Sequence, residues 1–215
     1  MIKRALDLYG GAGGVAIGLQ WAGYEVVGVD IEPQPDYPGT FLQADVLSLP
    51  KGFLDGFDLV WASPPCQAYS ATKNFHKNQH PDLIEPTRQL LADHPRTVIE
   101  NVPEAPLRVD LRLECKDFGI IKTRRPRIFE ISFECAPPPS LDLEYNYVVA
   151  AVGDGCPNKI LCDRRKSQGL KCHTTVAEIE DCFNIHHIKT GTMKQRRHAL
   201  NQCIPPIYAW WIAKD

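Results

Sequence analysis

The 215-residue sequence lacks any apolar run close to the ~20 residues of a membrane-spanning helix, so we expect no membrane association. It has no internal repeat, and its first residues, 1–7, enter a predicted strand rather than a signal peptide. Its eight cysteines include no C-x-x-C pair. Without a secretion signal they are expected to be thiols of an intracellular, cytoplasmic protein rather than a disulfide framework.

The net charge is also small, −2, but the charges are unevenly distributed. Residues 1–60 carry three Lys or Arg against eight Asp or Glu, whereas residues 151–215 carry ten against six. This asymmetry suits a partner with phosphates on one face, although any single basic run can equally be solvated surface. The length and the 44% hydrophobic content predict one globular domain with at most a small appendage.

The first thirty residues predict a strand, a helix and a second strand joined by a glycine-rich turn. An apolar strand ending at Tyr9 is followed by four glycines in the five residues 10–14, and the second strand, 24–30, ends at Asp30. Glycines let the backbone approach a ligand at a helix N-terminus, and Asp30 is placed to accept hydrogen bonds from ribose hydroxyls. Both NAD and S-adenosylmethionine fit this unit.

A proline pair directly precedes a cysteine at the end of another apolar run. Residues 57–62 predict a buried parallel strand, and Pro64-Pro65-Cys66-Gln67 follows it. The prolines end the sheet ladder and stiffen the backbone at the edge where α/β sheets bind ligands. Cys66 is therefore a candidate nucleophile, and an ordinary buried cysteine is the alternative.

Two further predicted strands carry a carboxylate near their ends. Asp45 ends an edge strand, where it either contacts an adenine amino group or caps a helix. Glu100 lies in the strand predicted over 96–103, which would bring it to the same rim as Cys66; a helix cap or a surface ion pair is the alternative. The polar residues 71–81 predict a mobile loop beside the thiol.

The second half of the chain is less regular. Residues 111–119 are expected to be irregular, residues 123–131 form a basic turn leading into one arm of an antiparallel edge hairpin, and helices are predicted over 174–184, 193–202 and from Pro205 onward. No metal is predicted, because the weak zinc hypothesis has no C-x-x-C pair. Its ligands would be Cys156, Cys162, Cys172 and His173.

With its motifs in family order, the chain resembles the cytosine-C5 DNA methyltransferase family, closely over residues 1–133 and loosely over 174–213. The resemblance implies an α/β, Rossmann-like S-adenosylmethionine-dependent methyltransferase fold, with a mostly parallel twisted sheet and an antiparallel edge hairpin. Residues 1–133 and 174–215 would form the catalytic domain. Residues 134–173 would form a much reduced, irregular target-recognition segment, as in a small phage- or prophage-like form.

The resemblance also implies a role for individual residues. Cys66 would be the nucleophile and Glu100 the acid, while Arg125 and Arg127 would hold the base oxygen O2 and the flanking phosphate. S-adenosylmethionine, with S-adenosylhomocysteine as its product, would be bound by Asp7, Tyr9, Gly11, Gly13, Gly14, Asp30, Ile31, Asp45, Val46, Pro64 and Asn201. The chain departs from the family pattern at Thr123, where Gln is usual, and at residues 200–202, which replace Gly-Asn-Ser.

The implied activity is methyl transfer to C5 of a flipped-out cytosine in double-stranded DNA, through a covalent adduct between Cys66 and C6, by a protein taken as a monomer. A tRNA cytosine methyltransferase would use the same residues. An NAD-dependent oxidoreductase would leave Cys66 and Glu100 unexplained, and a catalytically silent DNA-binding module is the remaining class. A recognition segment this short predicts a short target sequence, with Arg164, Arg165 and Lys166 as its expected contributors.

Overall fold

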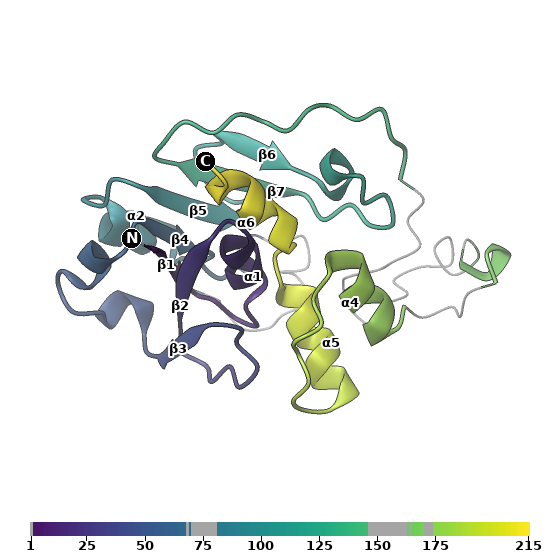
Figure 1. Cartoon of the computed structure of the whole chain (residues 1–215), viewed down its shortest axis with the longest axis horizontal. Helices are drawn as coiled ribbons and strands as arrows, with labels where there is room; N and C mark the ends of the chain where they lie inside the picture. Colours follow the sequence, from purple (N-terminus) through teal and green to yellow (C-terminus); the bar gives the residue numbers. More distant parts are fainter. Residues whose placement is uncertain (1, 68, 70–80, 146–162, 164, 170–173) are drawn as a thin grey trace.

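One seven-stranded sheet organises the protein (Figure 1). The computed structural model describes residues 2–67, 69, 81–145, 163, 165–169 and 174–215. The strand order across the sheet is β3-β2-β1-β4-β5-β7-β6. The strands are β1 (Lys3–Leu8), β2 (Tyr24–Asp30), β3 (Thr40–Gln43), β4 (Leu59–Ala62), β5 (Thr97–Asn101), β6 (Leu111–Leu113) and β7 (Arg127–Ile131).

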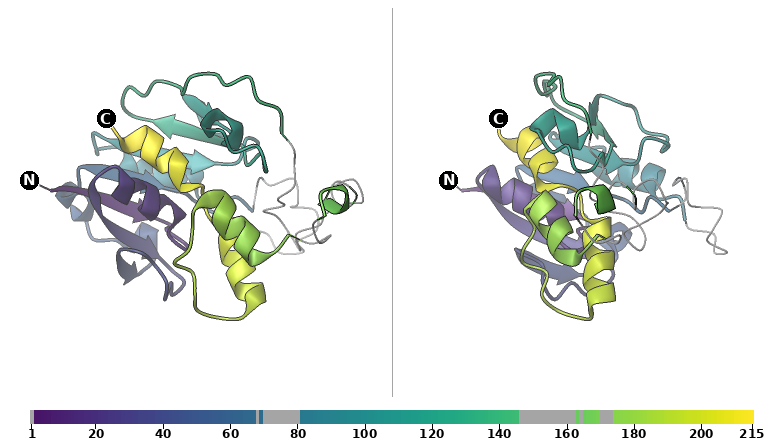
Figure 2. Two further views of the ribbon diagram at one scale, coloured as in Figure 1. Left: turned by 45° about the vertical axis from the view of Figure 1, so that its right-hand side comes forward. Right: turned by 90° about the vertical axis from the view of Figure 1, so that its right-hand side faces the viewer.

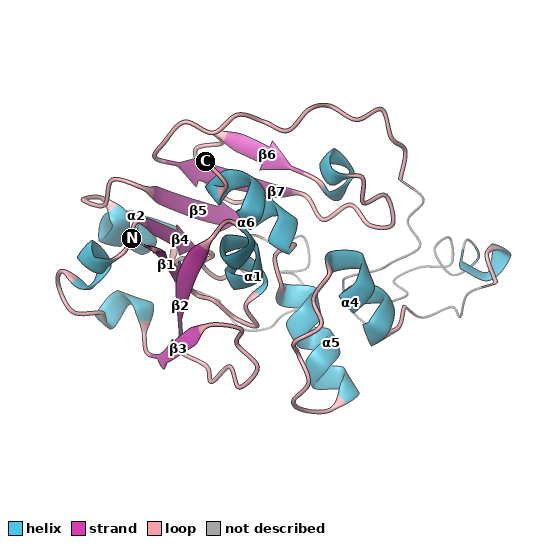
Figure 3. Ribbon diagram, viewed as in Figure 1, coloured by secondary structure: helices cyan, strands magenta, loops and turns pink. Residues whose placement is uncertain are grey.

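Helices cover the sheet and extend beyond it (Figure 3). Helices α1 and α6 lie side by side over one face, and α4 and α5 pack together beyond the sheet (Figures 1 and 2). No helix in the described part of the chain is long and apolar enough to cross a membrane. The helices are α1 (Gly14–Trp21), α2 (Ile84–Leu91), α4 (Val176–Phe183), α5 (Met193–Gln202) and α6 (Pro206–Ala213).

The register of the sheet brings the ends of several strands to one rim. Strands β3, β2, β1, β4 and β5 are parallel, and the strand order reverses between β1 and β4, where ligands bind in open α/β sheets. Strand β7 is antiparallel to β5, so Arg127 at its beginning reaches the rim where β5 ends with Glu100 and Asn101. This arrangement confirms the predicted, mostly parallel sheet with an antiparallel edge.

Both faces of the sheet are buried, which explains the continuous apolar runs of the central strands. One core contains Trp61, Phe129 and Tyr208, whose rings meet edge to face, and it extends to α1, α4 and α6. The other core lies on the opposite face and includes Leu6 and Ile84 with the residues of α2. All four residues of β4 are buried, so the cysteine loop that follows it starts from a rigid base.

Two helices meet closely at a glycine. A Cβ atom added at Gly18 of α1 would lie 2.0 Å from the carbonyl oxygen of Pro206 and 2.8 Å from the Cβ of Ala209. The absence of a side chain therefore allows α1 and α6 to touch through their backbones. This contact holds the chain after α5 against the glycine-rich turn that precedes α1.

The structure differs from the sequence expectation over residues 111–119, which are regular rather than irregular. They contain β6 and a 3-10 turn, Cys115–Phe118. Strand β6 has only three residues and pairs with β7 alone, so its alternation is too short to be recognised. The predicted mobile loop, 71–81, lies outside the described residues except for Pro81.

Candidate active site

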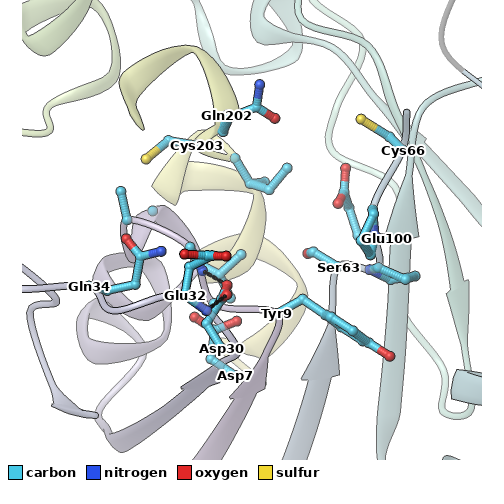
Figure 4. Close-up of a pocket in the computed structure, with 18 of the residues that line it drawn as sticks. Asp7, Tyr9, Asp30, Glu32, Gln34, Ser63, Cys66, Glu100, Gln202 and Cys203 are labelled. Carbon is cyan, nitrogen blue, oxygen red and sulfur yellow. Dashed lines mark hydrogen bonds between the residues drawn. The ribbon is translucent and has the colours of Figure 1, made fainter. Parts of the chain in front are cut away.

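A cavity of 420 Å³ lies at the carboxyl rim of the sheet, within the size range of ligand pockets in proteins (Figure 4). The ends of β1 and β2 and the glycine-rich turn form one side, and the residues that follow β4, with Glu100 near the end of β5, form the other. The end of α5 closes the side between them (Figure 4). Residues that the resemblance assigns to cofactor binding and residues that it assigns to catalysis therefore line one cavity.

The glycine-rich turn is held open by its backbone conformation. Tyr9, Gly11 and Gly13 have φ values of 59°, 47° and 81°, in the left-handed region. The amide of Gly11 donates a hydrogen bond of 2.9 Å to Oδ2 of Asp30, which fixes the turn to the end of β2. Gly13 is the N-cap of α1 and does not line the cavity, whereas Gly11, Gly14 and Asp30 do.

Asp7 is fully buried below the turn and has an incomplete set of hydrogen bonds. The hydroxyl of Tyr37 donates to its Oδ2 at 2.8 Å, while its Oδ1 has no hydrogen-bond partner in the described protein. Burial raises the pKa of Asp7 to about 7, against the opposing effect of the Tyr37 hydrogen bond. A buried acceptor without a partner beside a glycine turn fits a ligand that brings a cation or a donor, such as the ammonium group of S-adenosylmethionine.

The proline loop is fixed to the neighbouring strand. Asn101 donates from Nδ2 to the carbonyl oxygen of Pro64 at 2.9 Å, and Trp61 donates from Nε1 to Oγ of Ser63 at 3.0 Å. Pro64 and Cys66 both line the cavity, and the Cys66 side chain is half-buried. The thiol is therefore held at a defined place at the cavity wall, as expected for a nucleophile and unusual for a core cysteine.

Glu100 lies beside the thiol and is paired within the protein (Figure 4). Its Oε1 is 2.7 Å from Nε of Arg127, and both side chains are nearly buried. Burial raises the pKa of Glu100, and the positive charge of Arg127 opposes that shift. A carboxyl whose neutral form is favoured can donate a proton to a substrate atom.

The Cys66 thiol shares this electrostatic environment. Burial raises its pKa, and the charge of Glu100 raises it further, whereas Arg127 and Arg125 lower it. The neutral thiol is therefore favoured in the free protein, and the thiol ionises more easily when Glu100 carries a proton. The two groups are coupled, because protonation of one makes ionisation of the other easier.

Besides Gly13, two residues predicted at the site, Arg125 and Asn201, do not line the cavity. The guanidinium of Arg125 is buried and donates to the backbone carbonyls of Asn201 and Cys203, at 2.8 Å for the latter. Arg125 does not line the cavity, and neither does Asn201. Their predicted contacts with substrate and cofactor stay predictions, and the geometry shows Arg125 fixing the junction between α5 and α6.

The remaining residues predicted to bind the cofactor line the side of the cavity where its adenine group is expected. Asp45 accepts hydrogen bonds from Leu47 N at 3.0 Å and from the Ser48 hydroxyl, so it caps a 3-10 turn and also borders the cavity. The position of Asp45 is thus compatible with both of its predicted roles, the helix cap and the contact with an adenine amino group. Tyr9, Ile31 and Val46 line the cavity too, and the Ile31 side chain is 64% exposed, as an apolar platform for a ligand ring would be.

Several cavity residues were not predicted. Gln202 and His198 line the cavity from α5, where they lie four residues apart and so on one helical face. The four-residue spacing of a helix was the sequence signal that could have indicated them. It places Gln202, and not its neighbour Asn201, on the same helical face as His198. The other unpredicted residues include Glu32, Gln34, Ser63 and Cys203, seen in Figure 4.

The expectation that Arg165 contacts DNA bases is wrong. Arg165 is fully buried, and its guanidinium donates to both carboxylate oxygens of Glu178, at 2.8 and 3.0 Å. Glu178 in turn caps α4 together with Thr175. Arg165 is thus a structural partner of α4, while Lys166 is exposed and Arg164 lies outside the described residues.

No group of three His, Cys, Asp or Glu side chains able to hold a metal ion occurs in the part of the chain that the structure describes. The four residues of the zinc hypothesis, Cys156, Cys162, Cys172 and His173, lie outside that part. The hypothesis therefore stays untested.

The sheet order and the position of the cavity define a Rossmann-like α/β fold. No family model matches the chain, and no curated protein matches it by sequence. Among solved structures it is similar to a candidate DNA modification methyltransferase encoded within an E. coli prophage, with a TM-score of 0.68, 15% identity and coverage of 99% of this chain and 97% of that one.

Two eukaryotic methyltransferases share the fold. The S. pombe Dnmt2 methyltransferase has a TM-score of 0.63 and 15% identity, with 98% of this chain and 97% of that one covered. The Entamoeba histolytica methyltransferase EhMeth has a TM-score of 0.62 and 14% identity, with 98% and 96% covered. At such identities the likeness establishes the fold, and it confirms the predicted fold class.

Proposed function

We propose that this chain is an S-adenosylmethionine-dependent DNA cytosine-C5 methyltransferase of a small form. One observation carries the proposal. Cys66, Glu100 and Arg127 meet at one side of a single cavity, and the glycine-rich turn with Asp7 and Asp30 forms the other side. A nucleophile with an acid facing a cofactor turn is what methyl transfer to a carbon of a nucleobase requires.

The cofactor side supports S-adenosylmethionine. When bound, this cofactor would supply an electrophilic methyl group on a sulfonium. Asp7 and Asp30 would receive its donor groups, and the exposed Ile31 side chain would face its adenine ring. Asp45 and Val46 border the same side and would contact the adenine edge.

The nucleophile side supports covalent activation of cytosine. Cytosine C5 is a weak nucleophile, and addition of the Cys66 thiolate to C6 forms a C6–S bond that makes C5 electron-rich. C5 would then take the methyl group that bound S-adenosylmethionine supplies, with S-adenosylhomocysteine as the product. Loss of the C5 proton to a base breaks the C6–S bond and returns the Cys66 thiolate. Because the base must enter a cavity at the sheet rim, it has to leave the DNA helix.

Glu100 and Arg127 would act on the edge of the base. Neutral Glu100 donates to N3 as negative charge develops during the addition, and its raised pKa suits that role. Arg127 has a planar fork of donors, so it can hold O2 while remaining paired with Glu100. Ser63 also bonds to Glu100 and keeps the carboxyl in place.

Incubation with radiolabelled S-adenosylmethionine tests the activity. Duplex DNA, single-stranded DNA and tRNA are offered separately, and we expect label in duplex DNA. Label confined to tRNA would make the protein an RNA methyltransferase with the same chemistry. Absence of label from all three, with cofactor binding intact, would favour a silent binding module.

The covalent step has its own test. Duplex DNA containing 5-fluorocytosine should form an adduct that survives denaturation, because fluorine at C5 cannot leave as a proton does. Cys66→Ser should abolish both transfer and adduct while cofactor binding remains. Cys135→Ser is the matched control, since Cys135 is a partly buried cysteine outside the cavity, and it should retain both.

A further inference from the structure

Helix α5 carries a polar stripe that continues from the cavity along its surface. His198 and Gln202 line the cavity, and Lys194 lies about one helical turn before His198, at the same four-residue spacing. Lys194, His198 and Gln202 are all exposed at the residue level. The stripe therefore starts at the cavity and runs outward over the protein surface.

The helix that carries the stripe is firmly held. Thr192 and Gln195 form a capping box at its beginning, and Leu200 is fully buried on its inner side. Arg196 points away from the stripe, because it bonds to the carbonyl oxygen of Ile188 at 2.9 Å and to Glu180 of α4 at 2.6 Å. Because the backbone of this helix is already fixed, little conformational freedom is lost when a partner binds to its side chains.

The segment before α5 is fastened to the cofactor side. Asp36 accepts hydrogen bonds from the amides of Lys189 and Thr190, at 2.9 and 2.6 Å, and from the Thr190 hydroxyl at 2.7 Å. His187 bonds through Nε2 to the carbonyl oxygen of Ala12 at 2.7 Å. The position of the stripe is thus set relative to the glycine-rich turn.

The segment of chain that carries the stripe has formal charges of one sign. Residues 182–214 contain five Lys or Arg and no Asp or Glu. The nearby carboxylates described above are engaged, Asp36 with backbone amides and Glu180 with Arg196. A surface of this kind attracts an anion, and phosphates are the anions beside any nucleotide that enters the cavity.

We infer that Lys194, His198 and Gln202 form a contact surface for the phosphodiester backbone of the DNA strand that carries the target nucleotide. This inference rests on the proposed function and adds to it the path of the strand. The ammonium group of Lys194 neutralises a phosphate, while the ring and amide N–H groups of His198 and Gln202 donate to phosphate or sugar oxygens nearer the cavity. Such contacts position DNA and do not read its sequence.

Binding of fluorescently labelled duplex DNA, measured by anisotropy over a range of salt concentrations with S-adenosylhomocysteine present, tests this surface. Lys194→Ala should weaken binding several-fold and make the slope of log K against log salt less negative by about 0.9, the value for one phosphate contact. Lys194→Glu should weaken binding more. Lys51→Ala is the matched control, because Lys51 is exposed, precedes β4 and so lies toward the opposite rim of the sheet; its binding should equal wild type.

The outcomes separate this inference from the proposed function. If wild type methylates and binds DNA but both Lys194 variants bind with unchanged affinity and slope, the α5 surface is refuted and the function stands. If wild type neither binds nor methylates DNA, both are refuted. Unchanged affinity of the Lys194 variants for S-adenosylhomocysteine shows that the loss concerns DNA alone.

Discussion

At the scale of single residues, the candidate nucleophile and the candidate acid control each other. Burial raises the pKa of both Cys66 and Glu100, and the charge of Glu100 adds to the shift of Cys66. The positive charge of Arg127 lowers both pKa values and so opposes both shifts. Uptake of a proton from solvent by Glu100 would thus make the Cys66 thiolate easier to form.

Removing the charge of Glu100 should make Cys66 more acidic. In Glu100→Gln the repulsion is lost and Arg127 is no longer neutralised, so both changes favour the thiolate. We expect the pH midpoint of Cys66 alkylation by iodoacetamide, followed by peptide mass spectrometry, to move to lower pH. The same variant should lose methyl transfer by roughly 10²- to 10⁴-fold, the usual contribution of a general acid.

Cys135 in the same samples is the internal control. The pKa of Cys135 is raised by its own burial and by Asp215, so Glu100→Gln should leave its alkylation midpoint in place. A Cys66 midpoint that stays fixed or rises in the variant would contradict the coupling between the two groups.

Asp7 should make folding stability depend on pH. Its pKa is about 7 in the folded protein and about 4 in an unfolded chain, so the folded state holds the proton more tightly. The resulting stabilisation is complete below pH 4 and is lost as the pH rises through 7. Between pH 5 and pH 8 the free energy of unfolding of wild type should fall relative to Asp7→Asn by roughly 2 kcal/mol.

Urea denaturation of both proteins without cofactor, at several pH values, measures that difference. Asp45→Asn is a suitable comparison, since Asp45 is an exposed carboxylate at the same rim that caps a turn. A wild-type curve parallel to that of Asp7→Asn across this pH range would show that Asp7 is already ionised in the fold.

At the scale of elements, the contact of α1 with α6 sets where α5 ends and hence which side chains close the cavity. Gly18→Ala places a Cβ against the backbone of Pro206, which cannot move without shifting α6. We expect a loss of roughly 1–3 kcal/mol in the free energy of unfolding, the usual cost of overpacking, measured by urea denaturation.

Gly56→Ala is the control for that prediction. A Cβ there would approach only the flexible end of the Arg4 side chain, at 3.4 Å, and its backbone conformation is open to any residue. Its stability should stay within about 0.5 kcal/mol of wild type, as for most surface changes. Equal losses in both variants would mean that the close approach of α1 and α6 is not what Gly18 provides.

The elements that the sequence predicted well are those with strong local signals. Strand β2 was expected over its observed range, because an apolar run there is bounded by Gly23 and Asp30, and the Pro64-Pro65 pair marked the end of β4. Strand β6 was missed because three residues carry too little periodicity. Arg165 was misassigned because a charged side chain normally stays in solvent, and its burial depends on an ion pair with Glu178 of the following helix, α4.

The candidate site residues were likewise predictable where the local sequence signal was strong. Cys66, Glu100 and Asp30 could be predicted to lie together because strand ends meet at one rim of a parallel sheet, and they line one cavity. Gln202 and His198 could not be found this way, because they reach the cavity only through the packing of α6 on α1. Arg125 was assigned to substrate by motif alone, whereas its surroundings are the carbonyls that end α5.

At the scale of the whole molecule, little of the chain is left for reading DNA sequence. The expected recognition segment, 134–173, has forty residues, below the ~50 of an independent domain. Part of it is tied to the catalytic body: Tyr145 bonds through its hydroxyl to the amide of Lys116, and the carbonyl of Ala136 accepts from Trp211. Arg165 is also engaged, by Glu178, which leaves Lys166 as the exposed basic residue of its described part.

We therefore predict a short recognition sequence. Each good bidentate contact with a base supplies about 1–3 kcal/mol of discrimination, so two or three contacts define the target cytosine and one or two neighbours. A random duplex library is treated with the protein, unmodified cytosines are chemically converted, and the library is sequenced, with a Cys66→Ser treatment as background. We expect dense methylation with at most three fixed positions around the modified cytosine. Methylation confined to sites with four or more fixed positions would show that the segment, or a second copy of the chain, reads more bases than these contacts allow.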